Sequence, residues 1–216
     1  MADWFTLVFT ITRTPEAMKK SLIVIDDFLN DPDPLRAAAL AQEFPKFEGV
    51  NNYPGRDSKY PQIINGFDAE IARIIGEPIE PAPMDSHARF RLALEGDKGK
   101  DGVHIDPVNW TVILYLTLPE HCQGGTHLFR HKESGTDHAP YNAQELKAMG
   151  FTNEDDFMAE ILDKNTNNPE AWEELTLIPM RYNRLVIMRP QQYHDAGVSF
   201  GTTPENGRLV YLTTYY

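Results

Sequence analysis

From residue 89 onward the sequence alternates short β-prone runs with turns that contain glycine, proline and asparagine. The runs cover residues 89–94, 102–105, 110–118, 126–129, 175–179, 184–188, 196–200 and 208–215. Short strands at this spacing are typical of a sandwich or a closed barrel. The second part of the chain is therefore predicted to be a β domain.

The residues before this β region are predicted to add a strand and two helices. Residues 21–29 have the composition of a buried strand that runs into a loop. The sequence Asp-Pro-Asp-Pro predicts a helix over 34–43, and apolar positions at helical spacing predict a second helix over 66–76. Between them, residues 44–62 combine turn residues with aromatics and are predicted to form a structured loop.

One long insertion interrupts the strands. Residues 138–172 contain two predicted short helices, 142–149 and 153–162, and an insertion of this kind usually covers something, such as the mouth of a barrel. All-β proteins of 216 residues often form one domain. We therefore expect a single domain, with a strand and helices over about 1–85 and a β core over about 86–216 that carries the insertion.

The charge of the chain bears on its partners. The net charge of −12, from 32 acidic and 20 basic residues, repels phosphate backbones and anionic lipids. We expect no nucleic-acid or membrane partner, and no apolar run approaches the roughly 18 residues needed to cross a bilayer. Cys122 is the only cysteine, which excludes an intrachain disulfide and fits a reducing cytoplasm. The apolar residues 4–11 are expected to form a first strand or a loose leader.

His104 and Asp106 form the first candidate site. Residues two apart in a strand point to the same face, so this imidazole and carboxylate can bind one ion while Ile105 packs on the other side. An apolar strand follows at 110–118, and His194 at the end of a later core strand can supply a third ligand from across the barrel. Two histidines and one carboxylate leave three positions open on an octahedral metal, as in non-haem Fe(II) oxygenases. A surface His–Asp pair without a metal is the alternative.

Further motifs follow the His-x-Asp pair in a fixed order. They are His104-Ile-Asp106, Leu114-Tyr-Leu116, Gly124-Gly-Thr126, His194 and Gly207-Arg208. This order resembles the prolyl-hydroxylase-like branch of the 2-oxoglutarate- and Fe(II)-dependent oxygenases over residues 90–215. Residues 24–33 and 53–55 also look like a small bacterial set of uncharacterised oxygenase-like proteins. The resemblance implies a mostly β fold with flanking helices around a double-stranded β-helix, the jelly-roll core of cupin-like proteins.

The resemblance also implies cofactors. Fe(II) would be held by His104, Asp106 and His194, with 2-oxoglutarate as cosubstrate and O₂ as oxidant. In this family a basic residue after the distal histidine binds the remote carboxylate of 2-oxoglutarate, and Arg208 occupies that place, although its spacing from His194 is longer than usual. A guanidinium suits this role because it forks onto a carboxylate with two parallel hydrogen bonds. Arg91, on another predicted strand, is the competing candidate.

Two further pieces of the pattern are expected beside the cosubstrate. Tyr115 belongs to the more polar set of its strand, so its hydroxyl is expected to face inward to the cosubstrate, with core packing as the alternative. Gly124-Gly125 is expected to pass close to the metal and substrate, where side chains would block access, with a simple turn as the alternative.

The predicted activity is therefore hydroxylation of an amino-acid-like small molecule or a peptide side chain. The loop 47–62 and the insertion are candidates for a lid and substrate wall, with possible contacts from Tyr53, Arg56, Tyr60, Trp110 and Tyr193. One alternative is a non-catalytic, cupin-like metal-binding or sensing module. Another is a Mn or Zn hydrolase or isomerase, in which His127 or His131 would add a ligand. Arg208 favours the oxygenase, because a barrel that only binds metal has no need of an anion clamp. A zinc cluster that includes Cys122 fits no paired-ligand spacing.

Overall fold

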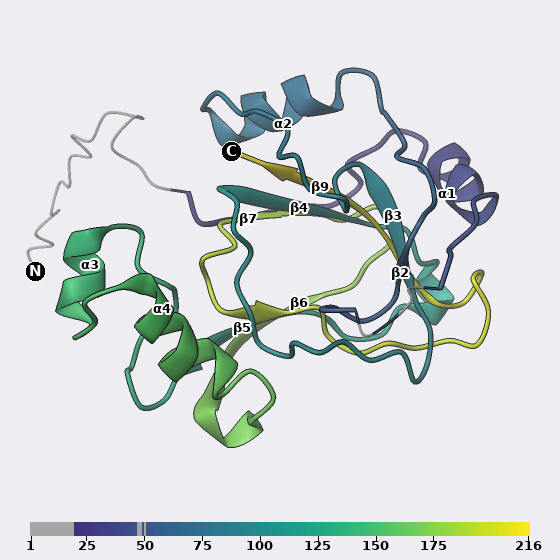
Figure 1. The fold of residues 1–216 in the computed structure, drawn as a ribbon. Helices are drawn as coiled ribbons and strands as arrows, with labels where there is room; N and C mark the ends of the chain where they lie inside the picture. Colours follow the sequence, from purple (N-terminus) through teal and green to yellow (C-terminus); the bar gives the residue numbers. More distant parts are fainter. Residues whose placement is uncertain (1–19, 47–48, 50) are drawn as a thin grey trace, which may run out of the picture.

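The computed structural model describes residues 20–46, 49 and 51–216, so the expectation for residues 4–11 lies outside the described residues. Two antiparallel sheets face one another, with helices on their outer sides (Figure 1). The elements in chain order are β1 (Leu22–Ile25), α1 (Asp33–Leu40), β2 (Arg56–Asp57), α2 (Phe67–Ile75), β3 (Arg89–Ala93), β4 (Trp110–Tyr115), β5 (Gly125–His131), α3 (Ala143–Ala148), α4 (Glu154–Phe157), β6 (Trp172–Pro179), β7 (Leu185–Met188), β8 (His194–Asp195) and β9 (Arg208–Tyr215).

The strand order identifies the core. The large sheet has the order β1-β7-β4-β9-β3-β2 and the small sheet the order β6-β5-β8, which an isolated bridge between His104 and His194 extends by one short segment. From β3 onward the chain alternates between the two sheets. In the large sheet these strands have the order β3-β9-β4-β7, and in the facing small sheet the order is the His104 segment, β8, β5 and β6. This is the connectivity of a double-stranded β-helix, a jelly roll. The predicted fold, mostly β with flanking helices, is confirmed.

The two faces of the large sheet pack against different partners. On the outer face, Trp110, Val112 and Leu114 of β4 are buried with Ile71 and Ile75 of α2. This helix lies between Gly66 and Gly76, whose φ angles of 80° and 81° suit glycine, as the spacing of its apolar residues predicted. The inner face carries a second cluster, composed of Ile113, Tyr115, Ile178, Met180, Val186, Phe200 and Val210. Tyr115 therefore lies on the inner face of its strand; its role beside the cosubstrate stays a prediction.

The insertion packs behind the small sheet. It contains α3 and α4, which continues as a π-helix over Met158–Asp163 where one regular helix was predicted. Phe157 and Ile161 of the insertion are buried in one cluster with Val103 and Tyr193, and Ile105 packs against this cluster. Val103 and Ile105 flank the candidate ligand His104 in the sequence, and Tyr193 precedes the candidate ligand His194. In Figure 1, α4 lies on the side of β5 and β6 that faces away from the large sheet, whereas α3 lies beside the ends of the sheets. The buried side chains of the insertion thus pack with residues of the small sheet and the segments next to it. That the insertion covers the mouth of the barrel stays a prediction.

One predicted strand is wrong. Residues 196–200 form no strand, and the pairing with β5 is confined to β8, immediately upstream. Gly197 has a φ of 72°, and a Cβ atom there would lie 2.1 Å from the carbonyl oxygen of Gly125. The backbone therefore turns away from the sheet at this residue, which the β propensity of its neighbours does not reveal. The predicted strand at 102–105 is likewise reduced to the single bridge at His104.

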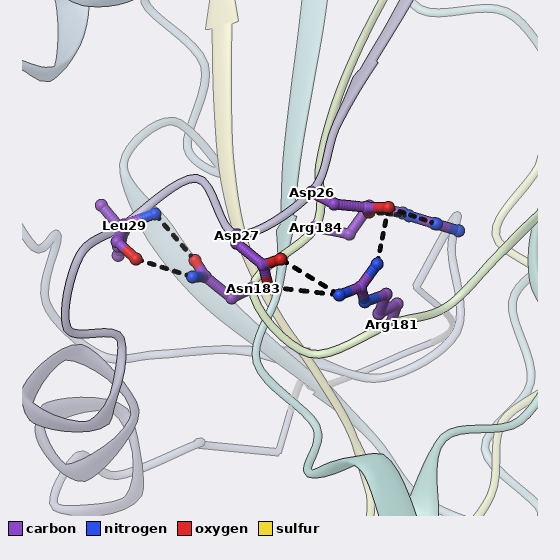
Figure 2. A network of polar contacts seen from close by, with 6 residues as sticks. All are labelled: Asp26, Asp27, Leu29, Arg181, Asn183 and Arg184. Carbon is purple, nitrogen blue, oxygen red and sulfur yellow. Dashed lines mark hydrogen bonds and ion pairs between the residues drawn. The ribbon is translucent and has the colours of Figure 1, made fainter.

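A polar clasp ties the segment after β1 to the turn between β6 and β7; it consists of Asp26, Asp27, Leu29, Arg181, Asn183 and Arg184 (Figure 2). The guanidinium of Arg184 donates from Nε to Asp26 Oδ1 at 2.6 Å, and that of Arg181 donates from Nη1 to Asp26 Oδ2 at 2.7 Å. The side-chain amide of Asn183 accepts from the backbone N–H of Leu29 at 2.9 Å and donates to its carbonyl at 2.7 Å. These contacts fix β1 on the edge of the large sheet.

No helix in the described part of the chain is both long and apolar enough to span a membrane.

Candidate metal centre

Two histidines meet at the end of the small sheet. The backbone N–H of His104 donates to the carbonyl of His194 at 2.9 Å, and the reverse hydrogen bond is 3.0 Å long. Residues paired in this way project their side chains to the same face, and the two ring centroids lie 4.3 Å apart. Asp106 follows two residues after His104, and its backbone N–H donates to the carbonyl of Pro190 at 3.1 Å. The structure therefore brings together the three predicted metal ligands.

The donor atoms are close enough to share one ion. Nε2 of His194 lies 3.6 Å from Oδ2 of Asp106, and Nε2 of His104 lies 3.9 Å from Oδ1. Ligand atoms about 2.1 Å from one ion lie roughly 3–4 Å from each other. Within residues 20–46, 49 and 51–216, these residues form the single His, Cys, Asp and Glu group with donor atoms all within 4.8 Å of one another. The geometry can hold a metal ion.

The histidine rings are oriented by backbone carbonyls. Nδ1 of His104 lies 2.8 Å from the carbonyl oxygen of Gly102, and Nδ1 of His194 lies 2.8 Å from that of Gln192. A ring that donates from Nδ1 keeps the lone pair of Nε2 for a metal, and such outer partners are typical of metal-binding histidines. Both rings thus present Nε2 toward Asp106.

The carboxylate of Asp106 accepts a hydrogen bond on each oxygen. Thr111 donates from Oγ1 to Oδ2 at 2.7 Å, and Tyr53 donates from its hydroxyl to Oδ1 at 3.2 Å. Thr111 comes from the predicted polar face of β4. Tyr53 was expected only as a substrate-wall residue, because a contact across 53 positions of the chain has no local sequence signal.

At two of the three candidate ligands, the pKa shift favours the protonation state that binds metal. Burial, together with the neighbouring His194, lowers the pKa of His104 to about 4, which keeps this ring neutral. Burial alone would raise the pKa of Asp106, but His194, His104 and Thr111 stabilise the carboxylate and hold its pKa well below the usual range. Burial lowers the pKa of His194, whereas Asp106 raises it, and the net change is upward. Metal binding requires the neutral ring and the ionised carboxylate, so the pKa shifts of His104 and Asp106 favour it, whereas that of His194 opposes it.

Arg208 is a buried cation inside the barrel. It lies on β9, two positions from the inward-facing Val210, and its relative exposure is 4%. The described residues form no hydrogen bond or ion pair with its guanidinium, and burial lowers its pKa. Tyr115, whose charge interacts with that of Arg208, places its hydroxyl 2.7 Å from Oγ1 of Thr126 on the opposite sheet. The interior therefore contains an unpaired positive group beside two hydroxyls.

Arg91, the competing candidate, already has a partner. Its Nε donates to Asp57 Oδ1 at 2.7 Å, and its Nη2 donates to Asp57 Oδ2 at 2.8 Å. The guanidinium also lies 5.5 Å from the centre of the Tyr53 ring. Of the two arginines, Arg208 is the one whose charge is left without a partner among the described residues.

The glycine pair has a packing role. A Cβ atom on Gly125 would lie 1.9 Å from the carbonyl oxygen of Ile178, and one on Gly124, at a φ of 58°, would lie 2.9 Å from the side chain of Val198. The glycines are therefore required by the close approach of neighbouring backbone and side chains. The next residue, Thr126, supplies the hydroxyl that meets Tyr115.

Other residues considered from the sequence lie away from this centre. Trp110 is buried in the cluster under α2, Tyr193 is buried under the insertion, and Tyr60 is 63% exposed. His127 contacts Glu174 at 2.9 Å, and His131 lies 3.0 Å from the hydroxyl oxygen of Ser134. Neither histidine joins Cys122 in a metal-binding group within the described ranges.

Comparison with known proteins identifies a family. A family of unknown function, DUF6445, matches residues 9–214. The chain belongs to this family. No curated protein matches this DUF6445 chain.

Several solved structures are similar to this DUF6445 chain at low identity. HygX from Streptomyces hygroscopicus, solved with nickel and 2-oxoglutarate bound, is 10% identical with a TM-score of 0.47, over 90% of this chain and 82% of that one. SnoK, a non-heme alpha ketoglutarate-dependent carbocyclase from nogalamycin biosynthesis, is 13% identical with a TM-score of 0.48, over 94% and 84%. The non-heme iron oxygenase OrfP, in complex with Fe, is 11% identical with a TM-score of 0.32, over 84% and 77%.

Proposed function

We propose that this protein is a non-haem Fe(II)- and 2-oxoglutarate-dependent oxygenase. The observation that carries the proposal is the presence, inside one barrel, of a three-donor metal group and a buried guanidinium without a partner among the described residues. A buried cation is costly unless it is paired, so a fold that retains one is suited to an anionic ligand. A dicarboxylate that chelates the metal at one end and reaches Arg208 at the other satisfies both features.

The donor set fits Fe(II). Two imidazole nitrogens and one carboxylate oxygen leave open positions for a cosubstrate and O₂. A structural zinc site is usually closed by four protein ligands, whereas the group found in the described residues has three members. When bound, Fe(II) with 2-oxoglutarate and O₂ supplies the oxidation of a substrate C–H bond, coupled to decarboxylation of 2-oxoglutarate to succinate and CO₂.

The residues of the chain supply geometry and an enclosed interior. His104, Asp106 and His194 hold the ion, and Arg208 binds the remote carboxylate of 2-oxoglutarate through paired N–H groups. Tyr115, whose hydroxyl lies 2.7 Å from Oγ1 of Thr126, would offer a second polar group to that carboxylate. The buried side chains of the inner cluster exclude water around these groups, which strengthens the charge interactions.

The substrate is proposed to be an amino-acid-like small molecule or a peptide side chain. This substrate class is supported by the resemblance of the motifs and by the polar and aromatic residues of the loop that precedes β2, such as Tyr53. Turnover screens should therefore find activity on amino acids or peptides. A screen in which only sugars or nucleobases are oxidised contradicts this substrate class.

Finer assignments rest on the sequence motifs. The motif order supports the prolyl-hydroxylase-like branch, and the single cysteine supports a cytoplasmic location. The rival function, a cupin-like module that binds metal without catalysis, accounts for the three donors but gives no role to Arg208. For this reason the oxygenase is preferred.

An anaerobic titration tests the proposal. Apo-protein is titrated with Fe(II) and then with 2-oxoglutarate, and the absorption band of the metal chelate is recorded before O₂ is admitted and succinate is measured. We expect a saturable band and oxygen-dependent succinate in the wild type, and neither in His104→Ala. A wild type with no band and no succinate above that variant contradicts the oxygenase.

A further inference from the structure

Tyr53 contacts two of the three candidate metal ligands, although it lies outside the barrel strands. Its hydroxyl donates to Oδ1 of Asp106 at 3.2 Å, and its ring centroid lies 4.3 Å from that of His104, with 41° between the ring planes. It belongs to the segment that leads into β2. One side chain from a loop therefore touches both ligands that the His-x-Asp motif supplies.

The backbone around Tyr53 is bound to the residues that precede the metal-binding segment. The backbone N–H groups of Lys100 and Asp101 donate to the carbonyls of Asn51 and Asn52 at 2.8 and 2.9 Å. A Cβ atom on Gly99 would lie 2.4 Å from the carbonyl oxygen of Asn52, so the two segments are in close contact. The loop and the ligand segment are thus held as one unit.

The ring of Tyr53 has a second contact, with a charged side chain. The guanidinium of Arg91 lies 5.5 Å from the ring centre, and Asp57 holds this guanidinium through two hydrogen bonds of 2.7 and 2.8 Å. Asp57 pairs with Arg91 across strands β2 and β3, which sets its position. Contacts of the ring with His104 and Arg91 therefore hold the phenol in place next to Asp106.

The carboxylate of Asp106 has two ways to bind an ion. Through one oxygen it fills one coordination position, and through both it fills two. Each carboxylate oxygen has about two sites for hydrogen-bond donors or metals. Because Thr111 occupies a site on Oδ2 and Tyr53 occupies one on Oδ1, rotation of the carboxylate breaks a hydrogen bond.

We propose that Tyr53 is a positioning residue of the metal centre, whose hydroxyl holds Asp106 in the rotation that gives one oxygen to the ion and whose ring fixes the plane of His104. Two consequences follow. The ion binds more tightly because its ligands are already oriented, and the position that a second carboxylate oxygen would fill stays open. The second consequence rests on the proposed function, since the open position is used by 2-oxoglutarate.

The test compares three variants with the wild-type protein. Tyr53→Phe removes the hydroxyl and keeps the ring, and Tyr53→Leu removes both. The matched control is Tyr215→Phe, which also removes a tyrosine–aspartate hydrogen bond, from Tyr215 to Asp68 Oδ1 at 2.6 Å, in the cluster on the outer face of the large sheet. Co(II) is the metal probe, because its visible absorption reports coordination as well as affinity.

We expect Tyr53→Phe to weaken Co(II) binding about tenfold, within the range of about 10–100-fold for lost outer partners of metal ligands. Its Co(II) spectrum should change shape, and 2-oxoglutarate should bind the metal-loaded variant several-fold more weakly. Tyr53→Leu should weaken metal binding further. Tyr215→Phe should lower the thermal midpoint and leave the Co(II) affinity and spectrum as in the wild type.

Failure of this proposal is distinguishable from failure of the oxygenase. If Tyr53→Phe keeps the Co(II) affinity and spectrum of the wild type, the positioning role is overturned. This holds whatever the thermal midpoint of the variant is, and also if the wild type forms the absorption band with Fe(II) and 2-oxoglutarate. If the wild type binds Co(II) but shows no absorption band with Fe(II) and 2-oxoglutarate, the proposed function is overturned. A tenfold loss of Co(II) affinity in Tyr53→Phe would still support the role of Tyr53.

Discussion

Arginines in two regions of this molecule have opposite surroundings. In the clasp of Figure 2, Arg184 and Arg181 share the carboxylate of Asp26, and the hydrogen bond from Arg184 is the largest cause of the lowered pKa of that carboxyl. Inside the barrel, Arg208 is more deeply buried than either. Burial lowers its pKa, Tyr115 and Asp195 raise it through their charges, and the described residues form no hydrogen bond or ion pair with it. The clasp completes its own charge pairs, whereas the barrel interior leaves one open.

The difference separates residues that maintain the fold from residues suited to a ligand. A charge that is paired within the protein contributes to the folded state, so its removal should lower stability and leave binding unchanged. A buried charge without a partner costs free energy in the apo-protein, so its removal should lower ligand affinity without loss of stability. Substitutions in the two regions should therefore have opposite signatures.

The largest effect is expected at the metal ligands. Asp106→Ala removes the one anionic donor, so binding of Co(II) or Fe(II) should weaken by more than about 100-fold, because loss of outer partners alone costs about 10–100-fold. Isothermal titration of the apo-protein measures the change. Asp26→Asn, which alters a carboxylate in the clasp, should bind metal as the wild type does. Retention of stoichiometric metal in Asp106→Ala would remove this residue from the site.

The next effect is expected at Arg208. Arg208→Met should weaken 2-oxoglutarate binding about 100-fold, the equivalent of about 3 kcal/mol for a charged two-point hydrogen bond, with metal content intact. The thermal midpoint of the apo-variant should not fall, because an unpaired charge is removed. Arg208→Lys, which keeps the charge without the fork, should lie between the two proteins. Loss of metal in Arg208→Met would instead assign Arg208 to the structure.

In the clasp, Asn183→Ala should lower stability and spare binding. It removes two hydrogen bonds to Leu29 and places alanine at a φ of 61°, so the free energy of unfolding should fall by about 2–3 kcal/mol. Urea denaturation measures this change. In Asn183→Gly the φ angle causes no strain, so this variant measures the loss of the hydrogen bonds separately from that strain. A clasp variant with weaker 2-oxoglutarate binding at full metal occupancy would break the separation between the two regions.

The smallest effect is expected at Tyr115. Tyr115→Phe keeps the buried ring but removes the hydroxyl that meets Thr126, so 2-oxoglutarate affinity should fall about fivefold, equivalent to roughly 1 kcal/mol. Thr126→Val is the matched control, because it leaves the Tyr115 hydroxyl free to bind the cosubstrate. Unchanged affinity in Tyr115→Phe would favour core packing, the alternative that the sequence left open.

Local periodicity accounts for the parts of the fold and site that were predictable. The alternation along 110–116 separated the inner Tyr115 from the outer Trp110, and the spacing of two placed His104 and Asp106 on one face, since strand side chains alternate with a period of two. Gly66 and Gly76 indicated where α2 begins and ends. The strand predicted at residues 196–200 is wrong because β propensity carries no information about Gly197, whose backbone lies against that of Gly125 on a distant strand.

The sequence by itself thus determined a β domain of the sandwich or barrel class, the alternation of its strands and the His-x-Asp pair, all of which follow from residues that are neighbours in the chain. The jelly roll was implied by the resemblance of the motifs. Only the tertiary structure decided that His194 pairs with His104, that Tyr53 reaches Asp106, and that Arg91 has a partner in Asp57 whereas Arg208 has none among the described residues. The physical reason is that pairing and desolvation are properties of the space around a side chain. Residues from distant parts of the chain fill that space, and local sequence does not specify which they are.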